Sequence, residues 1–251
     1  MMAKESSLGI IILAAGKGTR MKSNKLKVMH EINSLPLIEY VMRTAEMLGA
    51  SLKPVVVVCN DDPAVQNYLK NRATYAVQKE RLGTGHAVMT AEDLLKGKVE
   101  NIVILYGDMP LLTASSIKKL VEKHLEKNNQ LTLVTTEVKD FNDWRESFYD
   151  YGRIVRGGLK NRIIKIVEKK DATEKELNIK ELNTALFCFN SDWLWSNLKN
   201  LKNNNKQGEY YLTDLVGLAF NEKQKLSSVI MDPKEAIGIN TINHLEIAAN
   251  L

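Results

Sequence analysis

This chain of 251 residues has no long hydrophobic run and no strong excess of charge, and it contains only two cysteines. No stretch approaches the roughly 18 apolar residues that cross a bilayer. The apolar run near the start is short, and glycines and basic residues follow it at once. It therefore predicts a buried strand rather than a signal peptide. We expect a cytoplasmic protein with no membrane partner.

The two cysteines, Cys59 and Cys188, are too few and too far apart for a disulfide framework or a zinc site. Both lie in apolar runs, so we expect reduced thiols buried in strands. The four histidines are scattered along the chain and are more simply read as structural than as catalytic. The sequence has no Gly-x-Ser-x-Gly nucleophile elbow and no obvious Cys/His pair, so nothing in it indicates a protein nucleophile.

Charge is nearly balanced, with 35 Lys and Arg against 30 Asp and Glu, a formal net charge of +5. This excess is compatible with an anionic small substrate, but it is too small and too dispersed to predict a nucleic-acid partner. Hydrophobic residues make up 44% and charged residues 26%. That composition is globular and excludes a disordered chain, a collagen-like repeat and a coiled coil.

Short apolar runs alternate with helical patterns in the first half of the chain. The runs predict strands at 8–14, 54–59, 74–77, 102–106 and 131–138, and the patterns predict helices at 36–48, from 61–63 onward, at 84–95 and at 113–127. Such alternation predicts an α/β fold: a Rossmann-like, mostly parallel sheet with helices on both faces. Ligands of such sheets bind in the loops after the carboxyl ends of the strands.

The second half is less regular. It predicts a hairpin of 151–156 and 163–168, strands at 182–189 and 236–239, a polar surface loop at 197–205 and helices at 213–221 and 240–249. We expect one domain over residues 1–251, in which residues 139–190 contribute a smaller, β-rich lobe.

The most informative loop is Leu13-Ala14-Ala15-Gly16-Lys17-Gly18-Thr19-Arg20-Met21, directly after the first strand. Its glycines let the backbone approach a ligand and point amide groups at it, and Arg20 and the nearby Lys27 add positive charge. These features suit a polyphosphate. The dinucleotide fingerprint fails because Met21 replaces its third glycine, and the P-loop pattern is absent. The plain alternative is an ordinary glycine turn after a strand.

This loop, together with later segments, resembles the signature of the sugar-nucleotide pyrophosphorylases, and most closely that of the uridyltransferase domain of bacterial bifunctional uridyltransferase/acetyltransferases. The supporting segments are Gln78 with 82–87, then 106–110, 151–154, 166–168, 182–184 and 209–214. The resemblance runs from about residue 8 to the end and implies a fold of the nucleotide-diphospho-sugar transferase type.

The resemblance implies a Mg²⁺-dependent reaction in which N-acetylglucosamine 1-phosphate attacks the α-phosphate of UTP and expels pyrophosphate. UDP-N-acetylglucosamine would be the product, a precursor for peptidoglycan and the cell wall. Such chemistry needs no protein nucleophile, because a phosphate oxygen attacks once it is aligned and its charge is neutralised.

The resemblance also implies roles for individual residues. Arg20, Lys27 and Asp108 would be catalytic, and Asp108 with Asn240 would hold the metal. The matching substrate positions are Leu13, Ala14, Ala15, Gly16, Lys27, Gln78, Gly83, Thr84, Tyr106, Gly107, Asp108, Gly152, Glu168, Asn183 and Asn240. Of these, Gln78 and Gly83 would meet the base, whereas Gly152, Glu168 and Asn183 would meet the sugar.

Each role has a plainer structural alternative. Asp108 could be a turn residue, Asn240 the N-cap of the last helix, and Gln78 a surface residue beyond a strand. Gly83 and Gly85 could serve helix entry. Glu168 could be a solvated residue at a strand end, and Asn183 could be a turn residue. A glutamine amide can also flip, so Gln78 alone would accept uracil or cytosine, whereas a backbone amide at Gly83 cannot reverse its polarity.

The chain departs from the family pattern at four points. Leu26 replaces a usual proline, Ala185 replaces a common glycine, and the aromatic segment 141–150 is longer than the usual turn. That segment could be a lid or could cap a sheet edge, and capping is slightly favoured. No six-residue period is present, so we expect no acetyltransferase β-helix domain, and the oligomeric state stays open.

Two other functions remain open at this stage. One is a nucleotidyltransferase that uses CTP or another sugar or alcohol phosphate. The other is a nucleotide-binding module that has lost catalysis, which Leu26 and Ala185 would fit but the retained Arg20, Lys27 and Asp108 argue against.

Overall fold

The computed structural model describes residues 7–158 and 161–251. Its strands are β1 (Leu8–Leu13), β2 (Glu31–Ile32), β3 (Leu35–Pro36), β4 (Val55–Cys59), β5 (Thr74–Gln78), β6 (Asn101–Tyr106), β7 (Leu131–Glu137), β8 (Arg153–Gly157), β9 (Arg162–Val167), β10 (Glu181–Asn190) and β11 (Leu226–Ile230). Its α-helices are α1 (Leu37–Glu46), α2 (Ala64–Leu69), α3 (Thr84–Met89), α4 (Glu92–Leu95), α5 (Ala114–Lys127), α6 (Glu174–Leu177), α7 (Ser191–Leu198), α8 (Asp214–Asn221) and α9 (Ile242–Ala249).

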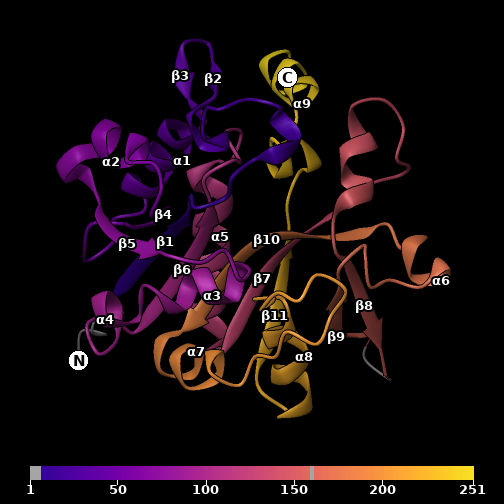
Figure 1. Cartoon of the computed structure of the whole chain (residues 1–251). Helices are drawn as coiled ribbons and strands as arrows, with labels where there is room; N and C mark the ends of the chain where they lie inside the picture. The colour runs from indigo at the N-terminus through magenta and orange to yellow at the C-terminus, as the bar shows by residue number, and fades with distance from the viewer. Residues whose placement is uncertain (1–6, 159–160) are drawn as a thin grey trace.

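The central sheet has the strand order β11-β7-β10-β6-β1-β4-β5. Strands β6, β1, β4 and β5 pair in parallel, as do β11 and β7, whereas β10 runs antiparallel to both β6 and β7. Strands β1, β4 and β6 are buried along almost their whole length, as expected for a sheet covered on both faces. Figure 1 shows helices on both sides of this sheet. The predicted α/β class and the mostly parallel sheet are confirmed.

The predicted hairpin is also present, as the antiparallel pair β8 and β9. It joins the main sheet where β8 pairs with β10, and α8 packs against β9 (Figure 1). The buried Arg153 at the start of β8 holds the preceding segment, because its guanidinium donates to the backbone oxygens of Tyr149 and Tyr151. Both cysteines are free and buried, as predicted.

Several predicted elements are wrong in detail. The helix expected at 84–95 is two short helices, α3 and α4, and the Thr90 hydroxyl between them donates to the oxygen of Ala87. No strand forms at 236–239, because the amides of Gly238 and Ile239 bond instead to Tyr151 and Asp108. The loop expected at 197–205 begins inside α7, which the sequence analysis missed together with β2, β3 and β11.

Candidate active site

The glycine loop after β1 is bent tightly against the residue predicted to bind phosphate. Gly18 has φ +67°, and a Cβ built there would lie 2.6 Å from Cβ of Lys27. Only glycine fits this position, because the backbone conformation and the close approach both exclude a side chain. Gly16 and Lys17 line a cavity next to the bend. The loop therefore places backbone and lysine side chains along one wall of that cavity.

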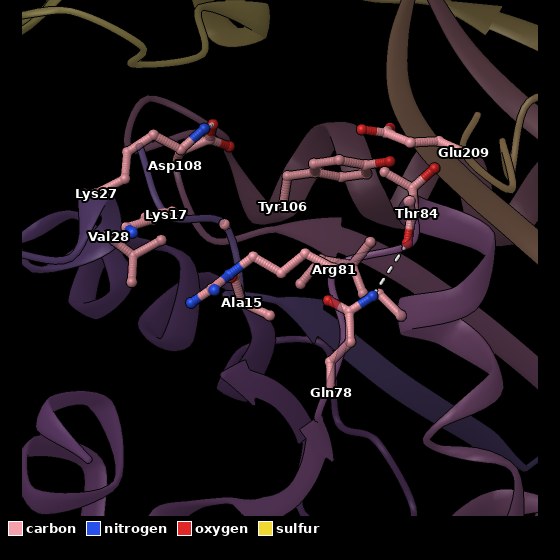
Figure 2. A pocket seen from close by; sticks show the side chains of 14 residues that line it. Ala15, Lys17, Lys27, Val28, Gln78, Arg81, Thr84, Tyr106, Asp108 and Glu209 are labelled. Atoms are coloured by element: carbon pink, nitrogen blue, oxygen red, sulfur yellow. Dashed lines mark hydrogen bonds and ion pairs between the residues drawn. The ribbon is translucent and has the colours of Figure 1, made fainter. Parts of the chain in front are cut away.

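This first cavity has a volume of about 330 Å³. It is lined by Leu13, Ala15, Gly16, Lys17, Lys27, Val28, Gln78, Arg81, Gly83, Thr84, Ala87, Tyr106, Asp108 and Glu209. Figure 2 shows side chains from the ends of several strands converging on it. The carboxyl ends of β1, β5 and β6 thus meet here, as expected for a ligand site of an open α/β sheet.

A cluster of three side chains lies at one end of the cavity. The ammonium group of Lys27 forms an ion pair with Asp108 Oδ2 and lies 3.1 Å from Asn240 Oδ1. Asp108 follows β6, and its own carbonyl accepts a hydrogen bond from Ile239 N at 2.9 Å, which fixes the segment that carries Asn240. Asp108 and Asn240, which lie 81 and 213 positions from Lys27 along the chain, are therefore brought together around its ammonium group.

The same cluster answers the alternatives proposed for Asp108 and Asn240. The N-cap of α9 is Thr241, whose side chain accepts from His244 N, so the capping alternative for Asn240 is wrong. Asp108 does lie in a turn after β6, as the alternative expected, but it is also 8% exposed and paired with Lys27, which a turn position alone does not require. Both oxygens therefore face the cation rather than a helix end.

The far end of the cavity is formed by Gln78, Gly83 and Thr84. Gln78 is the last residue of β5 and is 4% exposed, so the surface alternative is wrong. Its Nε2 donates to the oxygen of Gly83 at 3.1 Å. Gly83 itself begins α3 with φ +106°, and a Cβ there would lie 2.7 Å from the oxygen of Tyr210. Helix entry does explain this glycine, and it brings Gly83 to the cavity as well.

Two predicted residues, Ala14 and Gly107, act mainly by shaping these walls. Ala14 donates its amide to Val57 O at 2.9 Å, and Gly107 donates to Leu13 O at 2.9 Å. A Cβ at Gly107 would press on Ile38 and Val28. Ala14 and Gly107 therefore hold the loops together, and neither lines the first or the second cavity.

A second cavity of about 290 Å³ adjoins the first and shares Lys27, Thr84, Tyr106, Asp108 and Glu209 with it. Its remaining lining residues are Arg20, Met109, Asp150, Tyr151, Gly152, Glu168, Asn183, Thr184, Ala185, Gln207, Tyr211, Thr213, Gly238 and Asn240. All three residues predicted to meet a sugar are in this set. The two cavities meet at Lys27 and Asp108.

Glu168 and Asn183 are held in place by neighbours in this second cavity. Glu168 Oε1 accepts from the hydroxyl of Thr213 at 3.0 Å, and burial raises the pKa of its carboxyl above the ordinary value. Asn183 is 6% exposed and lies within β10, so the turn alternative is wrong. Its Oδ1 accepts from Ala185 N at 3.0 Å, and its own amide donates to Gly152 O at 2.9 Å.

Arg20 lies at the second cavity rather than the first. Its guanidinium contacts Asp150 Oδ2 at 3.0 Å, and Lys169 contacts Asp150 Oδ1 at 2.6 Å. The side chain of Arg20 is 55% exposed. The structure therefore places Arg20 in the cavity that holds the three predicted sugar positions, and Lys27, Asp108 and Asn240 line the same cavity.

The aromatic segment 141–150 packs largely on itself. Its residues from Asp143 form a 3₁₀ helix, Phe141 meets Tyr149 edge-on at 5.2 Å, and Phe148 is fully buried. None of its aromatic side chains lines the second cavity. This packing fits the capping alternative better than a lid.

The donor set around Lys27 is suited to a magnesium ion. The described residues, 7–158 and 161–251, contain no group of three or more His, Cys, Asp or Glu side chains that could enclose a metal. Asp108 and Asn240 offer only two side-chain oxygens, which is what Mg²⁺ uses when substrate phosphates and water complete its shell. The Lys27 ammonium lying on both oxygens shows that they already form a site for positive charge.

Comparison with known proteins agrees with this geometry. The profile of the MobA-like NTP transferase domain matches residues 10–209. The chain belongs to this family. The bifunctional protein GlmU of Desulfotalea psychrophila is 38% identical to this NTP transferase over 98% of the chain and 71% of the relative. GlmU of Acetivibrio thermocellus is 43% identical over 92% of the chain and 48% of the relative. The chain spans about half the length of this relative and of the GlmU proteins of Streptococcus uberis, Clostridium botulinum and Enterococcus faecalis.

Solved structures share the fold of this NTP transferase. One is described as a glucose-1-phosphate thymidylyltransferase from Bacillus anthracis, with a TM-score of 0.74, 18% identity and coverage of 97% of this chain and 94% of that one. Another is a UDP-glucose pyrophosphorylase complexed with UDP-glucose, with a TM-score of 0.72, 20% identity and 97% coverage of both chains. These likenesses confirm the nucleotide-diphospho-sugar transferase fold. No helix in the described ranges is long and apolar enough to cross a membrane.

Three residues that shape the site of this NTP transferase were not predicted from the sequence. Arg81 donates to Ala15 O at 2.9 Å and pairs with Asp61 at 2.7 Å, so it ties the glycine loop to the segment after β4. Its position between Gln78 and Gly83 was the available signal. Glu209 lines both cavities, and Tyr151 hydrogen-bonds the segment before Asn240. Both belong to matched segments, but nothing local in the sequence indicated their contacts.

Proposed function

We propose that this chain is a Mg²⁺-dependent uridylyltransferase that joins UTP and N-acetylglucosamine 1-phosphate into UDP-N-acetylglucosamine and releases pyrophosphate. The observation that carries the proposal is the meeting of two cavities at Lys27, Asp108 and Asn240. A nucleotide in one cavity and a sugar phosphate in the other would bring their phosphates together at this cluster. The reaction would supply a precursor for peptidoglycan and the cell wall, and its substrates suit a cytoplasmic enzyme.

The reaction needs alignment and charge neutralisation. An oxygen of the sugar phosphate attacks the α-phosphorus of UTP, a new P–O bond forms, and the bond to the leaving pyrophosphate breaks. No proton transfer and no protein nucleophile are required. Lys27 neutralises phosphate charge, and the glycine loop, with Gly16 beside Lys17, offers close backbone approach. Asp108 and Asn240 would hold Mg²⁺, which supplies further positive charge to the phosphates.

The base end supports UTP over CTP. Because Gln78 Nε2 donates to the Gly83 carbonyl, the amide oxygen of Gln78 is left as the group that meets the base. An acceptor there matches the N3–H of uracil and opposes the unprotonated N3 of cytosine. Figure 2 shows this oxygen on the side of Gln78 that faces Ala15 and Arg81.

The sugar end supports an N-acetylated sugar bound by the lobe of residues 139–190. Asn183 Oδ1 is used by Ala185 N, which leaves the amide NH₂ to donate to an acetyl carbonyl. Glu168 can accept from sugar hydroxyls through the oxygen that Thr213 does not use. Arg20 would meet the sugar phosphate, since it lines the same cavity.

Pyrophosphate release tests this function directly. We expect release with UTP and N-acetylglucosamine 1-phosphate in Mg²⁺, loss of release in EDTA, and recovery when Mg²⁺ is restored. CTP, glucose 1-phosphate and glucosamine 1-phosphate should be poorer substrates. Equal turnover with CTP would contradict the choice of base, and UTP binding without any release would favour a non-catalytic module.

Removal of Asp108 tests the metal cluster. We expect Asp108→Ala to lower turnover by about 10²–10³-fold, the range for loss of a main electrostatic stabiliser. Asp143→Ala is the matched control, since that side chain is 81% exposed and lies far along the chain in the aromatic segment. Near-normal turnover in a folded Asp108→Ala protein would remove Asp108 from the mechanism.

A further inference from the structure

The amide of Gln78 is held by two groups. Its Nε2 lies 3.1 Å from the carbonyl oxygen of Gly83 and 3.1 Å from Nδ1 of His86. A carbonyl oxygen only accepts, so the NH₂ of Gln78, and not its oxygen, must face Gly83. The second amide hydrogen then goes to His86 Nδ1. That nitrogen accepts when the imidazole is neutral and carries its proton on Nε2.

The two partners are themselves fixed. Gly83 begins α3, its oxygen also accepts from Ala87 N at 3.1 Å, and its Cα is pressed against the backbone of Tyr210. His86 stands on the first turn of the same helix, whose residue Gly85 donates its amide to Tyr210 O at 2.8 Å. Helix α3 therefore presents one backbone acceptor and one side-chain acceptor to the same NH₂ group.

The opposite side of the Gln78 amide is left for a ligand. Among residues 7–158 and 161–251, no donor forms a hydrogen bond with Gln78 Oε1. Gln78 is 4% exposed and lines the first cavity, and Figure 2 shows its oxygen turned toward Ala15 and Arg81. A flipped amide would place oxygen against the Gly83 oxygen, and His86 would lose its donor.

We propose that His86 is a positioning residue for nucleotide choice: its Nδ1 holds the Gln78 amide in the orientation that accepts uracil and rejects cytosine. This inference rests on the proposed function, because it concerns the base end of the same nucleotide cavity. His86 acts only through Gln78 and does not take part in phosphoryl chemistry. Its loss leaves only the Gly83 carbonyl to hold the amide, so less free energy is needed to turn the NH₂ toward N3 of cytosine.

The test compares kcat/KM for UTP and for CTP at a saturating concentration of N-acetylglucosamine 1-phosphate. His86→Leu and His86→Ala remove the acceptor. His86→Asn can restore it, because the Asn side-chain oxygen can occupy the place of Nδ1. Thr90→Ala is the matched control: it removes the Thr90 hydrogen bond to Ala87 at the end of α3 and leaves Gln78 untouched. Thermal melting monitored by circular dichroism checks the fold of each variant.

We expect the UTP-to-CTP ratio to fall by about tenfold in His86→Leu and His86→Ala, the scale of one hydrogen bond lost from recognition. The fall should include a gain in kcat/KM for CTP, and the KM for the sugar phosphate should stay constant. His86→Asn should return the ratio to within about threefold of wild type, and Thr90→Ala should leave it unchanged. If His86 had a purely structural role, its loss would lower kcat/KM for UTP and for CTP by the same factor.

An unchanged ratio in folded His86→Leu protein would overturn the inference and leave the proposed function standing. If the wild-type protein releases no pyrophosphate with any substrate pair, the proposed function fails, and equilibrium dissociation constants for UTP and CTP then test His86. A fall in the ratio of these constants on His86→Leu would support the inference, and equal ratios would reject it.

Discussion

Ala185 carries the clearest backbone strain in the candidate sugar site. It has φ +64°, in the left-handed region that favours glycine, and lies where β10 shifts register between Asn183 and Phe187. An L-residue in this conformation costs roughly 1–2 kcal/mol. The irregular strand lets the amide of Ala185 bond to Asn183 Oδ1 at 3.0 Å, so the strain accompanies the positioning of a proposed sugar ligand.

Replacement of Ala185 by glycine tests this strain. We expect Ala185→Gly to raise the free energy of unfolding by up to about 1 kcal/mol, because relief of strain outweighs the greater freedom of glycine in the unfolded chain. Urea denaturation measures the change. Ala114→Gly, at the first residue of α5, is the control and should destabilise the protein by about 0.5–1 kcal/mol. Equal losses in both variants would show that Ala185 is not strained.

At the scale of elements, one buried histidine joins a helix to two strands. His124 of α5 is 1% exposed, with Nδ1 3.0 Å from Thr132 Oγ1 in β7 and Nε2 3.0 Å from Asn101 Oδ1 in β6. Burial lowers the pKa of His124 to about 4. The sequence analysis read it as structural, and the contacts agree.

The lowered pKa makes the stability of the fold depend on pH. In the unfolded chain His124 is protonated below a pKa of about 6.5, whereas in the folded protein it stays neutral down to about 4. The unfolded state therefore binds an extra proton between these values, and stability falls as pH drops from about 6.5 to 4. At pH 5 the titration of His124 lowers the free energy of unfolding by about 2 kcal/mol.

Urea denaturation at pH 7 and pH 5 checks this prediction. Between pH 7 and pH 5, the free energy of unfolding should fall by about 2 kcal/mol more in the wild-type protein than in His124→Gln. The glutamine keeps hydrogen-bonding capacity toward Thr132 and Asn101 but does not titrate. Identical pH dependence in the two proteins would show that His124 does not set it.

At the scale of the whole molecule, Tyr151 connects the segment before β8 to the loop that carries Asn240. Its hydroxyl donates to Ala236 O at 2.8 Å and accepts from Gly238 N at 2.8 Å. The next residue, Gly152, accepts from Asn183 N. The positions proposed for the sugar and for the metal are therefore joined through one tyrosine between β8 and the aromatic segment, across 87 residues of sequence.

Tyr151→Phe should loosen this connection. We expect a loss of about 1–2 kcal/mol of stability from two hydrogen bonds, and a higher Mg²⁺ concentration for half-maximal turnover because Asn240 is less well held. Tyr149→Phe is the matched control, since that ring is 37% exposed and two residues away. Titration of turnover with Mg²⁺ makes the measurement, and the same Mg²⁺ dependence in both variants would argue against the connection.

The sequence alone determined the parallel core and the location of the site. Buried strands such as 102–106 are continuous apolar runs, and glycines or charged residues directly follow them, so local pattern was enough to place Gly16, Gln78 and Asp108 at strand ends. Resemblance then suggested their roles. Local pattern could not show β2, β3 or β11, whose short or half-exposed runs carry little signal.

Tertiary structure alone decided which side chains meet. Lys27 lies between Asp108 and Asn240, Arg20 faces Asp150, and Gln78 is turned by Gly83 and His86. Such contacts join residues from different strands and loops, and the orientation of each side chain depends on a hydrogen-bond donor or acceptor of its partner. That partner comes within reach only after the chain has folded, so the spacing of residues in the sequence does not encode the orientation.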